Sequence, residues 1–231
     1  MLFKDLKVIV TSGATQEPLD TVRFLTNISR GSFGAMIADE AVIQGAKVYY
    51  VHGKHAVIPH FIHSMKDIQV TSVLDLLREL EHLLLMEDAD VVIHAMAVSD
   101  FQVDMILNYQ GHELKGEKIN AGQSLTVHLK PTPNIIPRIK AWKNNVFLVG
   151  FELEPVEDES QLIDIGRRSN AKNHMDMCVV RRLHRIKKED HEAIFVNTRG
   201  EVHRHSGRSM IAKKLVRAIY NELHPELAAD D

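Results

Sequence analysis

Cysteine is nearly absent from this chain of 231 residues, because Cys178 is the only one. A lone thiol excludes an internal disulfide and any zinc site built from cysteines. Long apolar runs are also missing, since none approaches the roughly 20 residues that a membrane helix needs. The start of the chain, residues 1–7, is too charged and too short for a signal peptide. We therefore expect a cytoplasmic protein with no membrane partner.

Neither sign of charge is in large excess. The formal net charge is −3 with neutral histidines, and 45% of the residues are hydrophobic and 26% charged. These fractions are ordinary for a globular protein. No overall basic field would draw the chain to nucleic acid, so we expect no nucleic-acid partner. The length fits one large domain or two small ones.

Several well-known site signatures are absent too. The chain has no Gly-x-x-x-x-Gly-Lys-Ser/Thr, which excludes a P-loop, and residues 31–34 (Gly-Ser-Phe-Gly) lack the first glycine of a dinucleotide fingerprint. The expected strand 47–51 is followed by His52 rather than by an acid for a ribose hydroxyl, so NAD binding is disfavoured. There is no Gly-x-Ser-x-Gly elbow and no Tyr-x-x-x-Lys pair. The 14 histidines include no His-Glu-x-x-His pattern, and no protein metal site is predicted.

What the sequence does contain is an alternation of apolar runs and helical patterns. This alternation predicts an α/β fold, a Rossmann-like, open and mostly parallel sheet with helices on both faces. Residues 193–202 indicate an additional β-hairpin near the C-terminus. The expected strands are 8–10, 48–51, 91–95, 147–151 and 177–180, and the expected helices are 34–45, 72–86, 160–172 and 208–223. A mobile loop is expected over about residues 102–126, and a frayed tail over 224–231.

The segment 7–46 carries the strongest functional signal. An apolar run ends in a small, hydroxyl-rich turn with Gly13 and Ala14, and a second turn with Ser29 and Gly31 opens a helix. Unpaired N–H groups and the helix dipole at such a place favour an anion. We expect a nucleotide phosphate or a substrate carboxylate there. The alternative that the residues leave open is an ordinary strand–turn–helix connection.

Four other places could contribute chemistry. Asp100 follows the small residues after strand 91–95 and could accept hydrogen bonds from a base or ribose, or could simply cap the next segment. Phe151 could stack on a base, although most such residues belong to the core. Lys118 lies among glycines, where a lysine can close over phosphates. Arg168 and Lys172 share a helix face and suit a triphosphate, but alone they are a solvated face.

The sequence also resembles a known family. The segments TSGATQEPLDTVRFLTNISRG, IHAMAVSDF, GEKI, KPTPNII, VGFELE and NAKNHMDMC occur in this order and are similar to phosphopantothenoylcysteine synthetase, most closely to its stand-alone form. The resemblance covers Lys7 to about Leu223 and implies a single ligase domain over residues 1–231. It implies that 4′-phosphopantothenate is joined to L-cysteine on the way to coenzyme A. The expected nucleotide is CTP, with Mg²⁺ carried largely by its triphosphate.

The resemblance also implies roles for individual residues. Asn27 would hold the acyl intermediate, and Lys118 would stabilise charge in the nucleotidyl-transfer step; Arg23 would support and Ala97 would contact the substrate. The implied nucleotide-binding residues are Gly13, Ala14, Ser29, Gly31, His94, Ala95, Met96, Asp100, Pro133, Asn134, Ile135, Ile136, Phe151, Arg168 and Lys172.

This chain departs from the family pattern at a few positions. Arg30 stands where a serine is frequent, Arg168 where a lysine is usual, and Arg181 and Arg182 where many members have Asn-Asp. An arginine keeps the charge of a lysine but changes its geometry. The family also implies a homodimer, with the hairpin 193–202 as one candidate contact. Two alternatives remain from the residues: an NAD(P)-dependent reductase, and a nucleotide-sensing module without catalysis.

Overall fold

Parallel strands form the centre of the molecule, as the apolar runs predict. The computed structural model describes residues 1–114, 118–122, 124–187 and 191–226. Its main sheet has eight strands in the order β12-β11-β10-β9-β6-β1-β4-β5. The strands from β10 to β5 pair in parallel, and β11 and β12 pair antiparallel. The bounds are Lys7–Ser12 (β1), Lys47–Gly53 (β4), Lys66–Val70 (β5), Val91–His94 (β6), Phe147–Glu154 (β9), Met177–Arg182 (β10), Glu192–Asn197 (β11) and Val202–Ser206 (β12).

The strand order confirms the predicted Rossmann-like sheet. Six strands of the sheet are parallel, and in chain order they are β1, β4, β5, β6, β9 and β10. Numbered 1 to 6 in that order, they lie across the sheet as 3-2-1-4-5-6. This is the order of dinucleotide-binding sheets, and it reverses between the first and fourth strands. In this chain the reversal falls between β1 and β6, and we call it the switch point. Ligands of such sheets bind beyond the carboxyl ends of the strands there.

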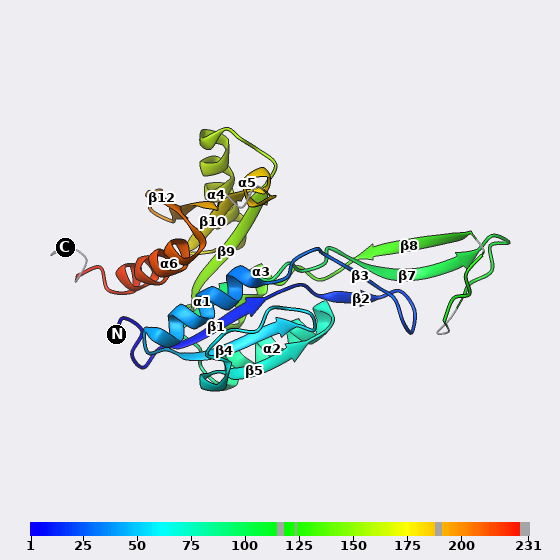
Figure 1. The fold of residues 1–231 in the computed structure, drawn as a ribbon, viewed down its shortest axis with the longest axis horizontal. Coiled ribbons are helices and arrows are strands. Elements are labelled where there is room, and N and C mark those ends of the chain that lie inside the picture. The colour runs from blue at the N-terminus through cyan, green and yellow to red at the C-terminus, as the bar shows by residue number, and fades with distance from the viewer. Residues whose placement is uncertain (115–117, 123, 188–190, 227–231) are drawn as a thin grey trace.

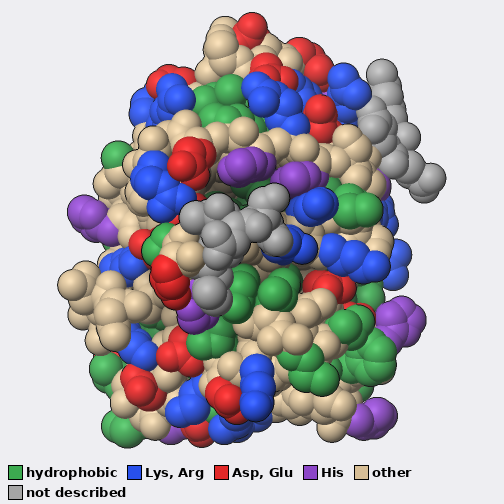
Figure 2. Space-filling view, turned by 90° about the vertical axis from the view of Figure 1, so that its left-hand side faces the viewer, with side chains coloured by type: hydrophobic (Ala, Val, Ile, Leu, Met, Phe, Trp, Pro, Cys, Tyr) green, Lys and Arg blue, Asp and Glu red, His purple; other side chains and the backbone are tan. Residues whose placement is uncertain are grey.

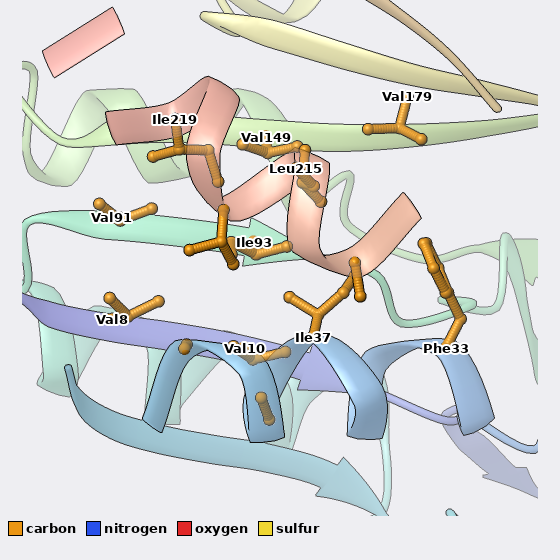
Figure 3. Packing of buried hydrophobic residues seen from close by; sticks show 14 of the residues in the cluster. Val8, Val10, Phe33, Ile37, Val91, Ile93, Val149, Val179, Leu215 and Ile219 are labelled. Atoms are coloured by element: carbon orange, nitrogen blue, oxygen red, sulfur yellow. The ribbon is translucent and has the colours of Figure 1, made fainter. Parts of the chain in front are cut away.

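Helices cover both faces of the sheet, as predicted. Figure 3 shows α1 and α6 above one face, where Ile37 and Leu215 pack with Val10 and Ile93 of the central strands. Leu76 of α2, Ile139 of α3 and Leu162 of α4 belong to the core on the other face. The bounds are Ser32–Ile43 (α1), Val73–Met86 (α2), Ile136–Trp142 (α3), Glu159–Asn173 (α4), Leu183–Lys187 (α5) and Arg208–Leu223 (α6), with a short 3-10 helix at Ile62–Ser64 (η1).

Local signals explain several of these boundaries. The hydroxyl of Ser72 accepts a hydrogen bond from the Asp75 N–H, and the Asp75 carboxylate accepts one from the Ser72 N–H. These two bonds form a capping box at the start of α2. The predicted hairpin forms as β11 and β12, and it extends the main sheet. Cys178 is buried in β10, where burial raises the pKa of its thiol.

A long arm projects from the sheet and was not predicted (Figure 1). It consists of two antiparallel hairpins, one from β2 (Gln16–Pro18) and β3 (Phe24–Thr26) and one from β7 (Phe101–Asn108) and β8 (Leu125–Pro131). The expectation of a loop over residues 102–126 is therefore wrong for 102–108 and 125–126. The pattern misled because Ile106 is the only buried residue of β7 and β8, so neither strand shows clear alternation. Of the predicted tail 224–231, residues 227–231 lie outside the described residues.

The opposite end of the molecule carries mixed charges. Figure 2 shows Lys, Arg, Asp and Glu side chains interspersed over that face. Within the described residues, no helix is both long and apolar enough to cross a membrane.

Candidate active site

The turns that follow β1 and β6 are joined to each other at the switch point. The Ala97 N–H donates to the Gly13 carbonyl at 2.9 Å, and the Thr15 N–H donates to the Ala97 carbonyl at 3.2 Å. Ala14 and Ala97 thereby continue the parallel pairing beyond the strands. The small side chains that follow both strands permit this close approach. The structure thus brings together Gly13, Ala14 and Ala97, three of the residues that the sequence analysis named for the site.

The second predicted turn packs directly against the first. The Ser12 hydroxyl donates to the Gly31 carbonyl at 2.9 Å. Gly31 has φ 69° and precedes α1, and a Cβ at this position would lie 2.4 Å from the Gly13 nitrogen. Only glycine fits a left-handed conformation at such a distance. The N–H groups of the first turn of α1, which have no partner within the helix, therefore begin beside the Gly13 turn. This arrangement suits an anion.

Threonine hydroxyls fix the two turns from within. The Thr11 hydroxyl accepts a hydrogen bond from the Met96 N–H at 3.2 Å and lies 2.9 Å from His94 Nδ1. The Thr15 hydroxyl accepts from the Ser99 N–H at 2.9 Å. Burial lowers the pKa of His94 to about 4, so its imidazole is neutral near pH 7. The sequence analysis named His94 as a nucleotide-binding residue but did not name Thr11 or Thr15. The signal that could have found them is their position, one on each side of the turn that ends the strand.

Asn27 bridges the two sides of the switch point. It follows β3, and its Nδ2 donates to the Val98 carbonyl at 3.1 Å while the residue stays exposed. Thr132 connects the neighbouring segment, because its N–H donates to the Asp100 carbonyl at 2.9 Å and its hydroxyl to the Ser99 carbonyl at 2.6 Å. Asp100 thus lies beside the turn that leads into α3. The predicted residues Pro133, Asn134 and Ile135 lie in that turn, and Ile136 begins α3. Ile135 is buried in the core, and so is Met96.

Lys118 lies on the arm and not at the strand ends. Its neighbour Ile119 donates through its N–H to Asp20 at 3.2 Å and accepts at its carbonyl from Arg23 at 2.8 Å. Arg23 also pairs with Asp20, and this hydrogen bond is the main cause that lowers the pKa of the Asp20 carboxyl. Arg23, predicted as a supporting residue, therefore holds the segment that carries Lys118. Gln16 lies at the base of the arm. At about 3.3 Å per residue of extended chain, Asp20 lies roughly 13 Å further along it, four residues on.

Of the remaining predicted residues, Phe151 lies near this centre, whereas Arg168 and Lys172 lie on the half of α4 that returns to the edge where the parallel strands begin. Phe151 meets Phe33 of α1 edge to face, with ring centroids 5.9 Å apart. Arg168 and Lys172 lie on the exposed side of α4, and Arg168 pairs with Asp164 at 3.0 Å. Ser169, between them in sequence, donates to Glu152 near the end of β9. Ser29 and Ala95 lie in the two turns themselves.

A cavity of about 510 Å³ lies elsewhere, against β11, β12 and α6. It includes Asn197, which pairs with Met177 at the start of β10, so it lies at the edge where the parallel strands begin. Both acids in its lining pair with Arg199, Glu201 at 3.0 Å and Glu222 at 2.7 Å. Fold geometry therefore favours the switch point over this cavity. Across the described part of the chain, no group of three His, Cys, Asp or Glu side chains could hold a metal ion.

Curated relatives match almost the whole chain. The coenzyme A biosynthesis bifunctional protein CoaBC of Thermococcus kodakarensis is 37% identical over 221 residues, covering 96% of this chain and 49% of the relative. The CoaBC protein of Bacillus subtilis is 33% identical over 177 residues, covering 74% of this chain and 39% of the relative. The chain thus spans about half the length, or less, of these relatives.

Solved structures agree with the fold. A DNA/pantothenate metabolism flavoprotein from Streptococcus pneumoniae superposes with a TM-score of 0.84 at 31% identity, covering 93% of this chain and 98% of that one. A Cab2 mutant in complex with phosphopantothenate-cysteine has a TM-score of 0.74 at 22% identity, covering 95% and 87%, which is a likeness of fold. The family model described as the DNA/pantothenate metabolism flavoprotein C-terminal domain matches residues 3–223. The chain belongs to this family, which confirms the resemblance that its sequence motifs indicated.

Proposed function

We propose that this chain is a phosphopantothenate–cysteine ligase that uses CTP. The observation that carries the proposal is the junction at the switch point, where two glycine-containing turns and the start of α1 surround one place beside the Asn27 amide. Relatives named for coenzyme A biosynthesis support the assignment, and a Cab2 mutant of the same fold was crystallised with phosphopantothenate-cysteine. The reaction would take place in the cytoplasm.

The proposed reaction has two half-reactions. In the first, a carboxylate oxygen of 4′-phosphopantothenate attacks the α-phosphorus of CTP, forms an acyl-cytidylate and releases diphosphate. In the second, the amine of L-cysteine attacks the acyl carbon, the amide bond forms, and CMP leaves with the electrons of the broken C–O bond. Because the cytidylate is already a good leaving group, positioning and charge stabilisation are the main tasks of the protein.

The residues at the switch point suit these tasks. The first-turn N–H groups of α1 can hold the anion without a protein cation. Asn27 Nδ2 donates to the Val98 carbonyl, and its amide oxygen accepts no hydrogen bond from the residues that the structure describes. A small rotation would therefore offer both amide groups to an acyl intermediate. Asp100 and the turn at Pro133 and Asn134 would meet the ribose and base. Lys118 would supply positive charge in the first half-reaction. The expectation that Arg168 and Lys172 meet the triphosphate does not fit a nucleotide at the switch point, because the C-terminal half of α4 leads to the opposite edge of the sheet.

Mg²⁺ fits this proposal only as a companion of the nucleotide. The described residues offer no three-ligand cluster, so the ion would be bound mainly through triphosphate oxygens. When bound, it would neutralise phosphate charge. The protein groups named above position the substrates independently of it.

We also propose a homodimer, and the arm is the better candidate contact. Phe24, Phe101 and Leu129 of the arm are 44%, 50% and 47% exposed. A cluster of exposed apolar residues often marks an interaction surface. The hairpin 193–202 is less suitable because β11 is buried between β10 and β12, which leaves only β12 accessible at the edge.

Diphosphate release tests the function directly. We expect release with CTP to require 4′-phosphopantothenate, to stop near one equivalent per site without cysteine, and to turn over when cysteine is added. The same series with ATP measures nucleotide preference. Release that ignores phosphopantothenate would contradict the ligase. Stabilisation by CTP without cysteine-dependent turnover would favour the sensing module, and tight NADPH binding in a fluorescence titration would favour the reductase.

A further inference from the structure

A pair of arginines without a carboxylate partner lies near the candidate active site. Arg181 is in β10 and Arg208 begins α6, and both approach the imidazole of His191. Arg181 Nη2 is 3.1 Å from His191 Nδ1, and Arg208 Nε is 2.5 Å from His191 Nε2. Within the described parts of the chain, neither arginine has an ion pair with an acid. Burial, and secondarily Arg208, lowers the pKa of Arg181 to about 10.

The hydrogen bonding of this pair is incomplete. The Nε of Arg181 is buried and has no hydrogen-bond partner in the part of the chain that the structure describes. A neutral imidazole has one N–H and one acceptor nitrogen, so His191 can accept from only one of the two guanidinium groups. The other contact places two N–H groups against each other. Buried donors in folded proteins nearly always have partners, and a bound ion or group is one explanation of an exception.

The neighbouring arginine shows what a structural role looks like in the same strand. Arg182 is buried, its Nη1 bonds to Glu192, and its Nε donates to the Glu157 carbonyl at 3.2 Å. Successive residues of a strand face opposite sides of the sheet. Arg182 thus faces the α4 side with acids around it, and Arg181 faces the α1 and α6 side, where no acid of the described residues pairs with it. The two arginines are neighbours at the same end of β10, so the difference between them comes from the face of the sheet on which each one lies.

The position connects the pair to the active site. The Arg181 guanidinium lies 4.7 Å from the ring centroid of Phe33, which is two residues beyond Gly31 in the first turn of α1. Phe33 in turn meets Phe151. The N-termini of α1 and α6 both lie at this edge, and their dipoles favour negative charge. Two arginines, a stacked aromatic ring and two helix starts therefore surround one place.

We propose that Arg181 and Arg208 bind a phosphoryl group of a substrate of this enzyme, an inference that rests on the proposed ligase function. The planar guanidinium of Arg181 would give its free Nε and an Nη to two phosphate oxygens, the bidentate geometry that arginine offers and lysine does not. The exposed Arg208 would close the site from the other side. Two sources share this chemistry, the 4′-phosphate of phosphopantothenate and the phosphates of CTP.

Calorimetric titrations of the full chain with 4′-phosphopantothenate, with CTP and with inorganic phosphate test the proposal. We expect Arg181→Met to weaken one of the two substrates roughly 10- to 100-fold, as loss of hydrogen bonds to a charged group should. The substrate that is weakened identifies the source, and Arg208→Gln should weaken the same one. Arg199→Gln, at the opposite edge of the sheet, is the matched control and should change neither by more than about twofold.

Thermal unfolding separates binding from a structural role. Unliganded Arg181→Met should keep or raise the Tm, because an unpaired buried cation is removed, whereas Arg182→Met should lower it. Unchanged affinity for both substrates in Arg181→Met and Arg208→Gln would overturn the proposal, as would a loss of Tm in Arg181→Met equal to that of Arg182→Met. Failure of the ligase function would look different, because wild-type protein would then bind the phosphoryl compounds without diphosphate release.

Discussion

Replacement of Gly31 by alanine tests whether contact between the two turns creates the active site. Gly31 has φ 69°, and an added Cβ would lie 2.4 Å from the Gly13 nitrogen and 2.5 Å from the Ser12 hydroxyl. Gly111 has a similar φ of 81° but no atom within 4 Å of an added Cβ. Both alanine variants therefore carry left-handed backbone strain, about 1–2 kcal/mol. Only Gly31→Ala adds a clash with main-chain atoms, worth about 1–3 kcal/mol when a packed site cannot relax.

Urea denaturation and CTP binding measure the two consequences. We expect Gly111→Ala to lower the free energy of unfolding by about 1–2 kcal/mol and Gly31→Ala by about 2–5 kcal/mol. Gly31→Ala should also abolish CTP binding, because the Gly13 turn and the start of α1 must separate to admit the methyl group. Equal destabilisation of the two variants, or normal CTP binding by Gly31→Ala, would refute the geometry.

Four further outcomes are expected. Asn27→Asp should stall the second half-reaction while acyl-cytidylate accumulates in mass spectra; normal product formation would exclude the assigned role. Lys118→Gln should slow the diphosphate burst roughly 10²–10³-fold, and an unaltered burst would exclude charge stabilisation by this lysine. The pKa of His94 is about 4 in the folded protein and near 6.5 in the unfolded chain. Between these values the unfolded chain binds the proton more readily, so the free energy of unfolding should fall as the pH is lowered from about 6.5 to about 4. The loss is roughly 3 kcal/mol at most, and urea titrations of His94→Gln should lack this part of the pH dependence. The position of Lys118, roughly 13 Å along the arm, suggests that it serves the site of the partner chain in the dimer. A mixture of Asn27→Ala and Lys118→Gln chains should then regain about a quarter of wild-type activity. No recovery would assign Lys118 to the site of its own chain.

The central sheet was predictable because its evidence is local. Runs such as Val8–Val10 and Val91–Ile93 are apolar at every position, which is typical of strands buried on both faces. Ser72 and Asp75 likewise lie three residues apart and cap α2 without help from the tertiary structure. The predicted turns at Gly13 and Gly31 came together because the fold places both at the carboxyl edge.

The arm was not predictable in the same way. Strand β2 is Gln-Glu-Pro and strand β3 is Phe-Leu-Thr, three residues each, and such short strands carry no period. Their order comes from distant contacts, such as the Glu17 carboxylate that accepts from the Val73 N–H at 2.7 Å. The role of Arg181 was hidden for a related reason. The sequence shows that it departs from the family pattern. Only the fold shows that, among the residues in described positions, no acid pairs with Arg181 whereas two pair with Arg182.

The origin of the arm explains why its position matters for chemistry. Its two hairpins are insertions after β1 and after β6, the strands that flank the switch point, so the arm and the anion site share a base. Thr26 donates to the Thr15 carbonyl at 2.7 Å on one side of that base, and Asn27 contacts Val98 across it. Any movement of the arm must therefore act on Asn27 and on the Gly13 turn together. Because Asp20 and Arg23 also hold the segment next to Lys118, the hairpin of β2 and β3 connects the two proposed catalytic residues, with Asn27 at its base and the Lys118 segment against its turn.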